Sequence, residues 1–227
     1  MSGGQTKGRL GPVRKASNGS LLKDTKKRTT YNLRERQYTM EEKALEIIQI
    51  MLSRRRKGST KVEPINLEGV EGANIYTIGN TLVIFSQKNS VIDRDIQKFI
   101  SAAEVHEFTQ GLIIVAMSPP SENVLKFVKS HAKNHVQFFH INQLKFDITT
   151  HRLAMPHRIL NEEEKTAVFR QYNILKPEEQ LPWIDSQDPM VKWIGAIPGD
   201  IIEIERHSDT VGKSFYYRYC AEDVNVA

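Results

Sequence analysis

The sequence contains little cysteine and no long apolar run. Its 227 residues include one cysteine, Cys220, so neither an internal disulfide nor a zinc site made of cysteines can form. The longest apolar run, residues 112–117, is far shorter than the ~20 residues of a membrane helix. Residues 1–10 are polar and glycine-rich, unlike a secretory signal. We therefore expect an intracellular protein of a reducing compartment, without a membrane span.

Motifs of nucleotide binding and catalysis are also missing. The sequence has no G-x-G-x-x-G and no G-x-x-x-x-G-K-[ST] loop, so no nucleotide site is expected. His131 and His135 are four residues apart, but the glutamate of a metalloprotease helix is absent, and we interpret both as surface histidines. Cys220 has no activating base beside it in the sequence. We expect no catalytic residue, no metal and no cofactor, and predict binding or assembly as the function.

Positive charge is concentrated at the start of the chain. Residues 1–37 carry ten basic and two acidic side chains, a net charge of +8, whereas the remainder has a net charge of −3. This segment has too few apolar residues to offset the entropy of ordering, so we predict a disordered basic tail. Phosphates or acidic protein surfaces would attract it. A solvated tail, or a nuclear-import signal at residues 26–28, is an equally open interpretation.

Residues 38–150 predict an N-terminal α/β domain with a mixed or parallel sheet. A helix is expected from a Thr39 cap to a basic run followed by Gly58. Further along, strands are expected at 73–78, 81–86, 111–117, 136–139 and 144–148, and helices at 90–105 and 121–135. Strands 73–78 and 81–86 flank a Gly79-Asn80 turn and predict a hairpin, and the apolar run at 111–117 is typical of a central strand.

The basic run consists of Arg54, Arg55, Arg56 and Lys57. Cations in the last turn of a helix complement its dipole, which is a structural explanation. The same side chains are candidates for contact with nucleic-acid phosphates. The sequence leaves both interpretations open.

Residues 151–227 predict a small α+β domain with a short sheet and two helices, and we place the domain boundary near Thr150. Asn161 and Glu164 have the spacing of a capping box at the start of one helix. Asp188 and Pro189 predict the start of a second helix, which Gly195 ends. Strands are expected at 181–184, 201–206 and 214–220. Trp183 and Trp193 flank the second helix and suit either the core or a partner contact.

The region 151–220 carries a series of motifs in a fixed order. They are Pro156-His157, Gln180-Leu181-Pro182, Asp188-Pro189, Gly195, Pro198-Gly199-Asp200, Arg206-x-Ser208-x-Thr210-x-Gly212 and Tyr217-Arg218. In these motifs the region resembles the assembly domain of the RNA polymerase subunit called H in archaea, the fifth largest of the subunits common to the nuclear polymerases. Upstream, residues 82–148 are more weakly similar to the jaw domain of the eukaryotic members. The jaw is shortened, and the basic tail is not a family feature.

The resemblance implies a non-catalytic subunit in a nucleus, which docks on the largest polymerase subunit and carries a jaw near downstream duplex DNA. It implies contacts to the largest subunit from Arg206, Ser208, Thr210, Gly212, Tyr217 and Arg218. It also implies that the assembly domain is shaped by Pro156, His157, Leu181, Pro182, Asp188, Pro189, Gly195 and Gly199. The final hairpin residues could instead serve only to hold the hairpin together. Weak, sequence-independent DNA contact would come from Arg54, Arg55, Arg56 and Lys57.

A second function remains open, which is an independent nucleic-acid-binding module that uses the basic tail. A polymerase subunit would bind the large subunits through residues 151–220, whereas a free module would bind nucleic acid through residues 1–60. In either case we expect no membrane contact and no homo-oligomer. The nearly neutral body of the chain predicts that DNA affinity in isolation would come mostly from the tail.

Overall fold

A computed structural model of the chain describes residues 40–55, 61–67, 70, 72–88, 91–106, 108, 111–208, 210 and 212–222. The basic tail, the expected Thr39 cap, and Arg56 and Lys57 lie outside the described residues. The described part is an α+β structure with two mixed sheets. None of its helices is long and apolar enough to cross a membrane.

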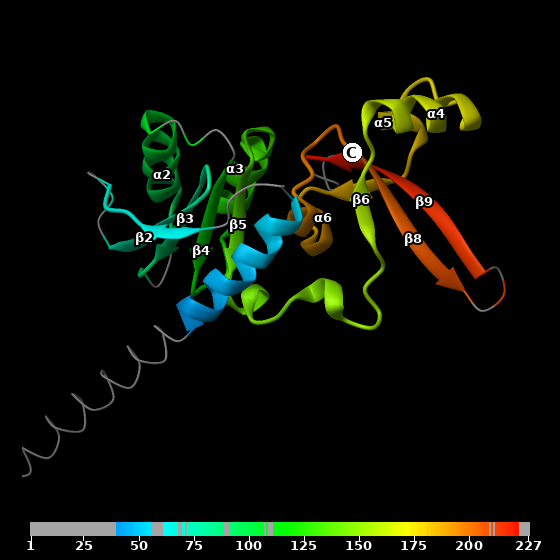
Figure 1. Cartoon of the computed structure of the whole chain (residues 1–227). Helices are drawn as coiled ribbons and strands as arrows, with labels where there is room; N and C mark the ends of the chain where they lie inside the picture. Colours follow the sequence, from blue (N-terminus) through cyan, green and yellow to red (C-terminus); the bar gives the residue numbers. More distant parts are fainter. Residues whose placement is uncertain are drawn as a thin grey trace, which may run out of the picture. The chain divides into compact units, whose positions relative to one another are not determined.

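The first sheet, here called the N-terminal sheet, contains five strands in sequence order (Figure 1). They are β1 (Val62–Pro64), β2 (Ala73–Ile78), β3 (Thr81–Ser86), β4 (Leu112–Ala116) and β5 (Val136–His140). Strands β1 to β3 pair antiparallel, and β3 to β5 pair parallel. This confirms the expected hairpin and the central strand, and it adds β1, which was not predicted.

Side chains of the N-terminal sheet point alternately into two apolar cores. The helices of this region are α2 (Asp93–Val105), α3 (Glu122–Ser130) and the helical residues 40–55. Leu82 and Ile84 of β3 share a core with α2 and α3, whereas Val83 and Phe85 share a core with helix 40–55. Strand β4 alternates in the same way. Because both faces are covered, β3 and β4 are buried at every residue, which explains the continuous apolar runs 82–85 and 112–116.

Two predictions for residues 121–150 are wrong. The helix expected up to His135 ends at Ser130, where the Nδ1 atom of His131 lies 2.9 Å from the carbonyl oxygen of Phe127. A short 3₁₀ helix, η1 (Ala132–Asn134), follows. The strand expected at 144–148 is replaced by the 3₁₀ helices η2 (Ile141–Leu144) and η3 (Ile148–Thr150). At η3 the Asp147 carboxylate accepts the backbone N–H of Thr149, and such local bonds favour turns over strands.

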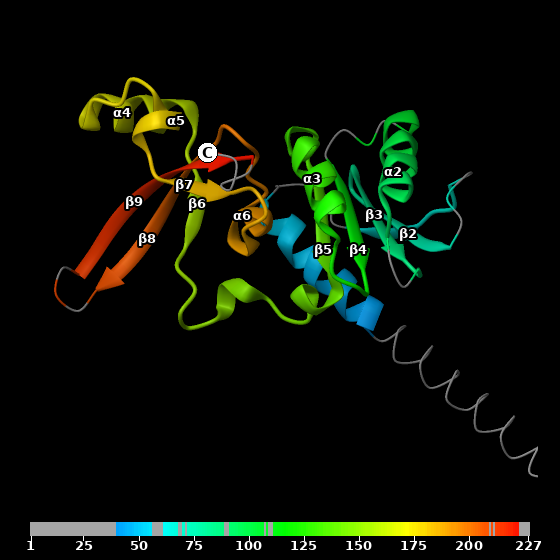
Figure 2. The same cartoon turned by 180° about the vertical axis from the view of Figure 1, so that it is seen from behind.

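The second sheet, here called the C-terminal sheet, has the strand order β6-β8-β9-β7 (Figure 2). Its strands are β6 (His157–Ile159), β7 (Trp183–Asp185), β8 (Ile201–Ser208) and β9 (Gly212–Ala221). The helices around it are α4 (Glu162–Tyr172), α5 (Pro177–Gln180) and α6 (Pro189–Ile194). Small apolar cores lie on both faces, one with α6 and one with α4. The expected boundary near Thr150 falls between β5 and β6 and stays a prediction.

The helix ends of this second region confirm the capping predictions. Asn161 accepts the N–H of Glu164 through its side chain at 2.8 Å, and the Glu164 carboxylate accepts the N–H of Asn161 at 3.0 Å. The Asp188 carboxylate accepts the N–H of Met190 at 2.8 Å at the start of α6. Gly195 ends α6 in the left-handed region, with φ +78°. Local sequence signals therefore determine where these helices begin and end.

Candidate partner interface

Strands β8 and β9, residues 201–221, form a ribbon that extends past its neighbours in the C-terminal sheet (Figures 1 and 2). Strand β6 pairs with β8 only at residues 202–204, and β7 pairs with β9 only at residues 219–221. The register between β8 and β9 continues to the pair Ser208 and Gly212. The outer part of the ribbon, from Glu205 to Phe215, therefore has no further strand on either side among the described residues.

The register places most of the predicted interface residues on one face of the ribbon. Residues that are paired across strands lie on the same face, and faces alternate along a strand. Arg206, Ser208, Gly212 and Arg218 consequently share the face that carries the core with α6. Tyr217 lies on the other face. The remaining predicted residue, Thr210, is in the turn, where its hydroxyl lies 3.0 Å from that of Ser208.

Two of the predicted interface residues are engaged at the base of the ribbon. Tyr217 packs in the core with α4, and its ring centroid lies 5.8 Å from that of Tyr172. Desolvation raises the pKa of Tyr217, and the nearby Glu203 carboxylate adds to this effect. The Arg218 guanidinium donates to the carbonyl oxygen of Trp183 at 2.9 Å. These contacts agree with the alternative interpretation, in which Tyr217 and Arg218 hold the ribbon in place.

The outer part of the ribbon carries aromatic side chains that were missed in the sequence. Phe215 is 46% exposed and Tyr216 is 48% exposed. A cation lies near each ring, with Lys213 Nζ 5.1 Å from the Phe215 centroid and the Arg206 guanidinium 5.9 Å from the Tyr216 centroid. Adjacent aromatic residues on a strand must point to opposite faces, so this pair could have been recognised as one ring per face.

Charge at the outer ribbon is largely balanced. The Glu205 carboxylate lies 2.7 Å from Lys213 Nζ and 2.9 Å from His207 Nε2. The hydrogen bond from Lys213 lowers the pKa of Glu205; desolvation opposes this effect, and His207 adds to it. A partner would therefore meet exposed aromatic rings together with Arg206, which has no carboxylate partner among the described residues.

The basic run at the end of helix 40–55 contacts other parts of the chain. Arg54 forms a salt bridge of 2.6 Å with Asp147 and also donates to Thr149. Partial burial would raise the pKa of Asp147, but hydrogen bonds from Thr149 and Arg54 outweigh this effect and lower it. Arg55 donates to the carbonyl oxygen of Trp193 at 2.9 Å. Contact of these side chains with DNA stays a prediction.

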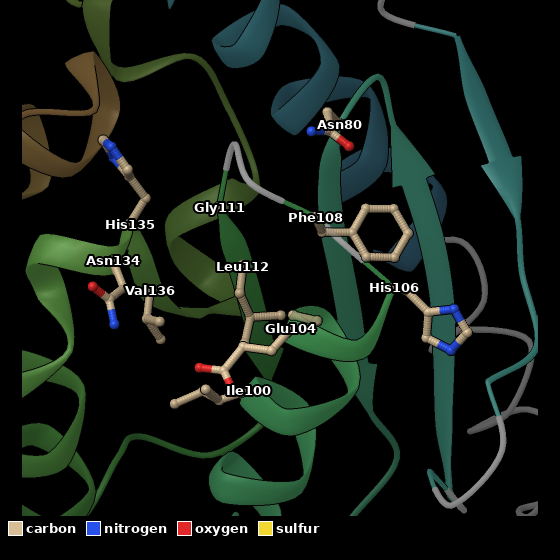
Figure 3. Close-up of a pocket in the computed structure, with 11 residues that line it drawn as sticks. Asn80, Ile100, Glu104, His106, Phe108, Gly111, Leu112, Asn134, His135 and Val136 are labelled. Carbon is tan, nitrogen blue, oxygen red and sulfur yellow. The ribbon is translucent and has the colours of Figure 1, made fainter.

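A hollow of about 1000 Å³ lies at the amino ends of the parallel strands (Figure 3). Gly111 is there because a Cβ atom would come within 2.9 Å of the His135 carbonyl oxygen, and its φ is +130°. The polar side chains of the lining do not converge, since His106 and His135 lie on opposite sides of the hollow. The described residues of its lining therefore form no cluster of acid, base and nucleophile of the kind that catalysis requires.

Two further chemically capable groups, Cys220 and Asp200, have structural surroundings. No group of three or more His, Cys, Asp or Glu side chains in this part could hold a metal ion. Cys220 is fully buried, and desolvation raises the pKa of its thiol to about 12. The Asp200 carboxylate accepts the backbone N–H of Ile197 at 2.9 Å and so stabilises its turn. Among the surfaces described, the outer ribbon is the candidate for recognition.

Comparison with known proteins gives matches concentrated in the second half of the chain. Residues 146–220 match the family described as RNA polymerase Rpb5, C-terminal domain. The DNA-directed RNA polymerase subunit Rpo5 of Thermococcus onnurineus is 51% identical over 79 residues, which make up 35% of this chain and 94% of that protein. Subunit Rpo5 of Sulfolobus acidocaldarius is 51% identical over 75 residues, or 33% of this chain and 87% of that protein.

A eukaryotic relative matches over a longer stretch. The Dictyostelium discoideum protein named DNA-directed RNA polymerases I, II, and III subunit rpabc1 is 28% identical over 140 residues, which cover 61% of this chain and 70% of that protein. The archaeal matches span nearly the whole of their proteins at about half identity. The chain therefore belongs to the Rpb5 family of RNA polymerase subunits, named Rpo5 in these archaeal relatives, as the motifs of residues 151–220 had indicated.

Proposed function

We propose that this protein is a non-catalytic common subunit of a DNA-dependent RNA polymerase in the nucleus. In this proposal the outer β8–β9 ribbon docks on the largest subunit, and the N-terminal sheet with its helices forms a jaw near downstream DNA. The observation that carries the proposal is the ribbon itself, which extends past β6 and β7 and exposes family motif residues beside two aromatic rings.

The composition of the outer ribbon suits a protein partner. Tyrosine and arginine are enriched among residues that dominate binding energy, and Tyr216 and Arg206 lie together on one face. Small residues at Ser208 and Gly212 on that face leave room for close approach. Beyond Glu205, whose N–H donates to the carbonyl oxygen of Pro156, no further strand of the described residues covers the edges of the two outer strands, so a partner strand could add there. Each feature supports docking by the ribbon end rather than by its base.

DNA contact is the second part of the proposal. Arg54 keeps 47% of its side chain exposed while it is bridged to Asp147, so it could also reach a phosphate. Arg56 and Lys57 continue the basic run, and the tail of residues 1–37 adds a net charge of +8. Contacts of this kind hold the backbone of DNA without reading its sequence, and they weaken as salt is raised.

The test is affinity purification of the tagged full-length chain from its native cells. We expect stoichiometric recovery of the two largest polymerase subunits, and loss of both when residues 151–227 are deleted. The variant Arg206→Glu should weaken recovery by about tenfold or more, because hot-spot residues contribute 2 kcal/mol or more. Arg170→Glu makes the same charge change at an exposed site on α4 and should have no effect. Recovery of no polymerase with the intact chain would refute the proposal.

A second experiment addresses DNA. The affinity of the isolated chain for a random-sequence duplex should fall steeply with salt, and removal of residues 1–37 should reduce both the affinity and the salt dependence. Equal affinity with and without the tail would contradict the predicted source of the binding.

A further inference from the structure

One arginine joins three elements that belong to different parts of the fold. Arg55, the last described residue of helix 40–55, donates to the carbonyl oxygen of Trp193 and to Gln137 Oε1, each at 2.9 Å. It also donates to the carbonyl oxygen of Lys192. Gln137 belongs to β5 of the N-terminal sheet, whereas Lys192 and Trp193 belong to α6, which packs on the C-terminal sheet.

Gln137 and Lys192 extend this contact into a buried network. Gln137 Nε2 donates to the Lys192 carbonyl oxygen at 3.2 Å. Lys192 Nζ in return donates to the carbonyl oxygen of Phe138 at 3.0 Å and lies 4.7 Å from the Phe139 ring centroid. Lys192 is 4% exposed and Gln137 is 8% exposed. Hydrogen bonds therefore run from β5 to α6 and from α6 to β5, and both are shielded from water.

The end of α6 is shaped to admit the arginine. A Cβ atom on Gly195 would lie 2.9 Å from Arg55 Cδ and 3.0 Å from Arg55 Nε. A side chain at this position would displace Arg55 from its present place, so Gly195 both ends α6 in the left-handed region and leaves space for Arg55. The guanidinium is consequently held between Gly195 and the edge strand β5.

Helix α6 is shared between two apolar cores. Val191 packs in the core of the C-terminal sheet, while Trp193 packs in the core between helix 40–55 and the N-terminal sheet. Apolar contact alone allows sliding, whereas hydrogen bonds require particular distances and angles. A rotation of one sheet against the other would separate the buried carbonyl oxygens of Phe138 and Trp193 from the donors Lys192 and Arg55, which is unfavourable.

We infer that Arg55, Gln137 and Lys192 form a clasp that fixes the C-terminal sheet on the N-terminal sheet in one orientation. All three residues act by positioning the two sheets relative to each other. A further consequence, which rests on the proposed function, is that docking of the ribbon on the polymerase also sets the position of the jaw. Almost the whole length of the archaeal relatives matches only about a third of this chain. The clasp would therefore be needed in a longer chain such as this one, which has a second sheet to position.

The test is a distance measurement by pulsed electron spin resonance on the full-length chain. Spin labels are attached at Ser101→Cys on α2 and Gln171→Cys on α4, both exposed positions. Cys220 is fully buried and does not compete for the label. The clasp predicts a single narrow distance distribution. In Arg55→Ala, and in Arg55→Lys, whose single nitrogen cannot take the places of both Nε and Nη2, the width should increase about twofold or more, because weakly joined regions move independently.

Lys43→Ala is the matched control, since Lys43 is an exposed cation on the same helix, and its distribution should stay narrow. Lys192→Met keeps the volume but removes the donor to Phe138, and it should broaden the distribution as Arg55→Ala does. Circular dichroism shows whether each variant is still folded, so broadening caused by lost positioning can be distinguished from unfolding. A broad distribution in the parent chain, a narrow one in both Arg55→Ala and Lys192→Met, or global unfolding of both variants would overturn the clasp.

The measurement is made on the isolated chain, so it does not depend on polymerase binding. Arg206→Glu should lose the polymerase while keeping the narrow distribution. Arg55→Ala should keep the polymerase, bound through the ribbon, while the distribution broadens. A chain that binds no polymerase yet shows the clasp would refute the proposed function alone.

Discussion

The N-terminal sheet and the β8–β9 ribbon use apolar side chains in opposite ways. In the sheet, strands β3 and β4 are buried at every position, and both of their faces contribute to cores. In the ribbon, the first residues of β8 are buried, but Phe215 and Tyr216 near its outer end are about half exposed. The apolar side chains of the sheet are buried in its cores, whereas some of those in the ribbon stay exposed and are available to a partner.

The difference shows where stability and recognition reside in this chain. A strand covered on both faces has no side chain left for a partner, so its substitutions should act on folding. The outer ribbon packs against little of its own chain, so its substitutions should act on binding.

The largest expected effect is in the centre of the N-terminal sheet. Ile114 is fully buried in the core with α2 and α3, so Ile114→Ala should lower the free energy of unfolding by about 2–5 kcal/mol through lost burial and a cavity. Val105→Ala removes a similar apolar surface from a residue that is 76% exposed and should change it by less than about 0.5 kcal/mol. Urea unfolding measures both. Equal effects would mean that the sheet is not the stable core.

The second effect concerns Lys192 of the clasp. Desolvation lowers its pKa from 10.5 to about 8, although Asp188 and Asp185 partly oppose this. The unfolded chain then binds more protons than the folded chain between these values, so this group makes the free energy of unfolding rise with pH. The rise should be on the order of 3 kcal/mol from pH 7.5 to 10.5.

The comparison with Lys192→Met isolates this contribution. The variant should lack the rise, and Lys43→Met, which removes an exposed lysine, should retain it. Burial raises the pKa of the Cys220 thiol from 9.0 to about 12, so this group lowers the free energy of unfolding as the pH rises above about 9. Cys220 is the same in all three proteins, so the difference between their curves still isolates Lys192. If the free energy of unfolding depended on pH in the same way in the parent chain and in Lys192→Met, Lys192 would be hydrated and the contact between α6 and β5 would be open to water.

A smaller effect is expected at the start of α4. The C-terminal sheet has two small cores, so local helix capping should contribute visibly to its stability. Asn161→Ala removes the acceptor for the N–H of Glu164 and should cost about 1 kcal/mol in urea unfolding. Gln171→Ala, an exposed change in the same helix, serves as the control. Loss of several kcal/mol would mean that Asn161 has a further role.

The sequence predicted what local signals determine. The hairpin of β2 and β3 followed from its two-residue turn, and the limits of α6 followed from Asp188 and Gly195. Residues 144–148 were misjudged as a strand because apolar residues there resemble one, while the Asp147 side chain stabilises a turn. Short polar side chains that bond to nearby backbone groups override weak periodicity.

The clasp could not have been predicted from the sequence. Arg55 lies 82 residues from Gln137 and 137 residues from Lys192, and no periodicity connects them. A basic run at a helix end suggested dipole stabilisation or phosphate contact, whereas the structure engages Arg54 with Asp147 and Arg55 with buried carbonyl oxygens. Side chains that meet only through tertiary packing leave no signal in a single sequence. The aromatic pair of the ribbon, in contrast, could have been recognised.

The smallest expected effect on stability is in the outer ribbon, and it tests the contrast most directly. Phe215→Ser and Tyr216→Ser should each change the free energy of unfolding by less than about 0.5 kcal/mol, because both rings are about half exposed. The double variant should nevertheless lose recovery of the large polymerase subunits, since exposed aromatic rings are strong anchors at interfaces. Phe146→Ser replaces a ring that is 56% exposed outside the ribbon and should retain the polymerase. A stable double variant that still recovers the polymerase would place the docking surface elsewhere on the C-terminal sheet.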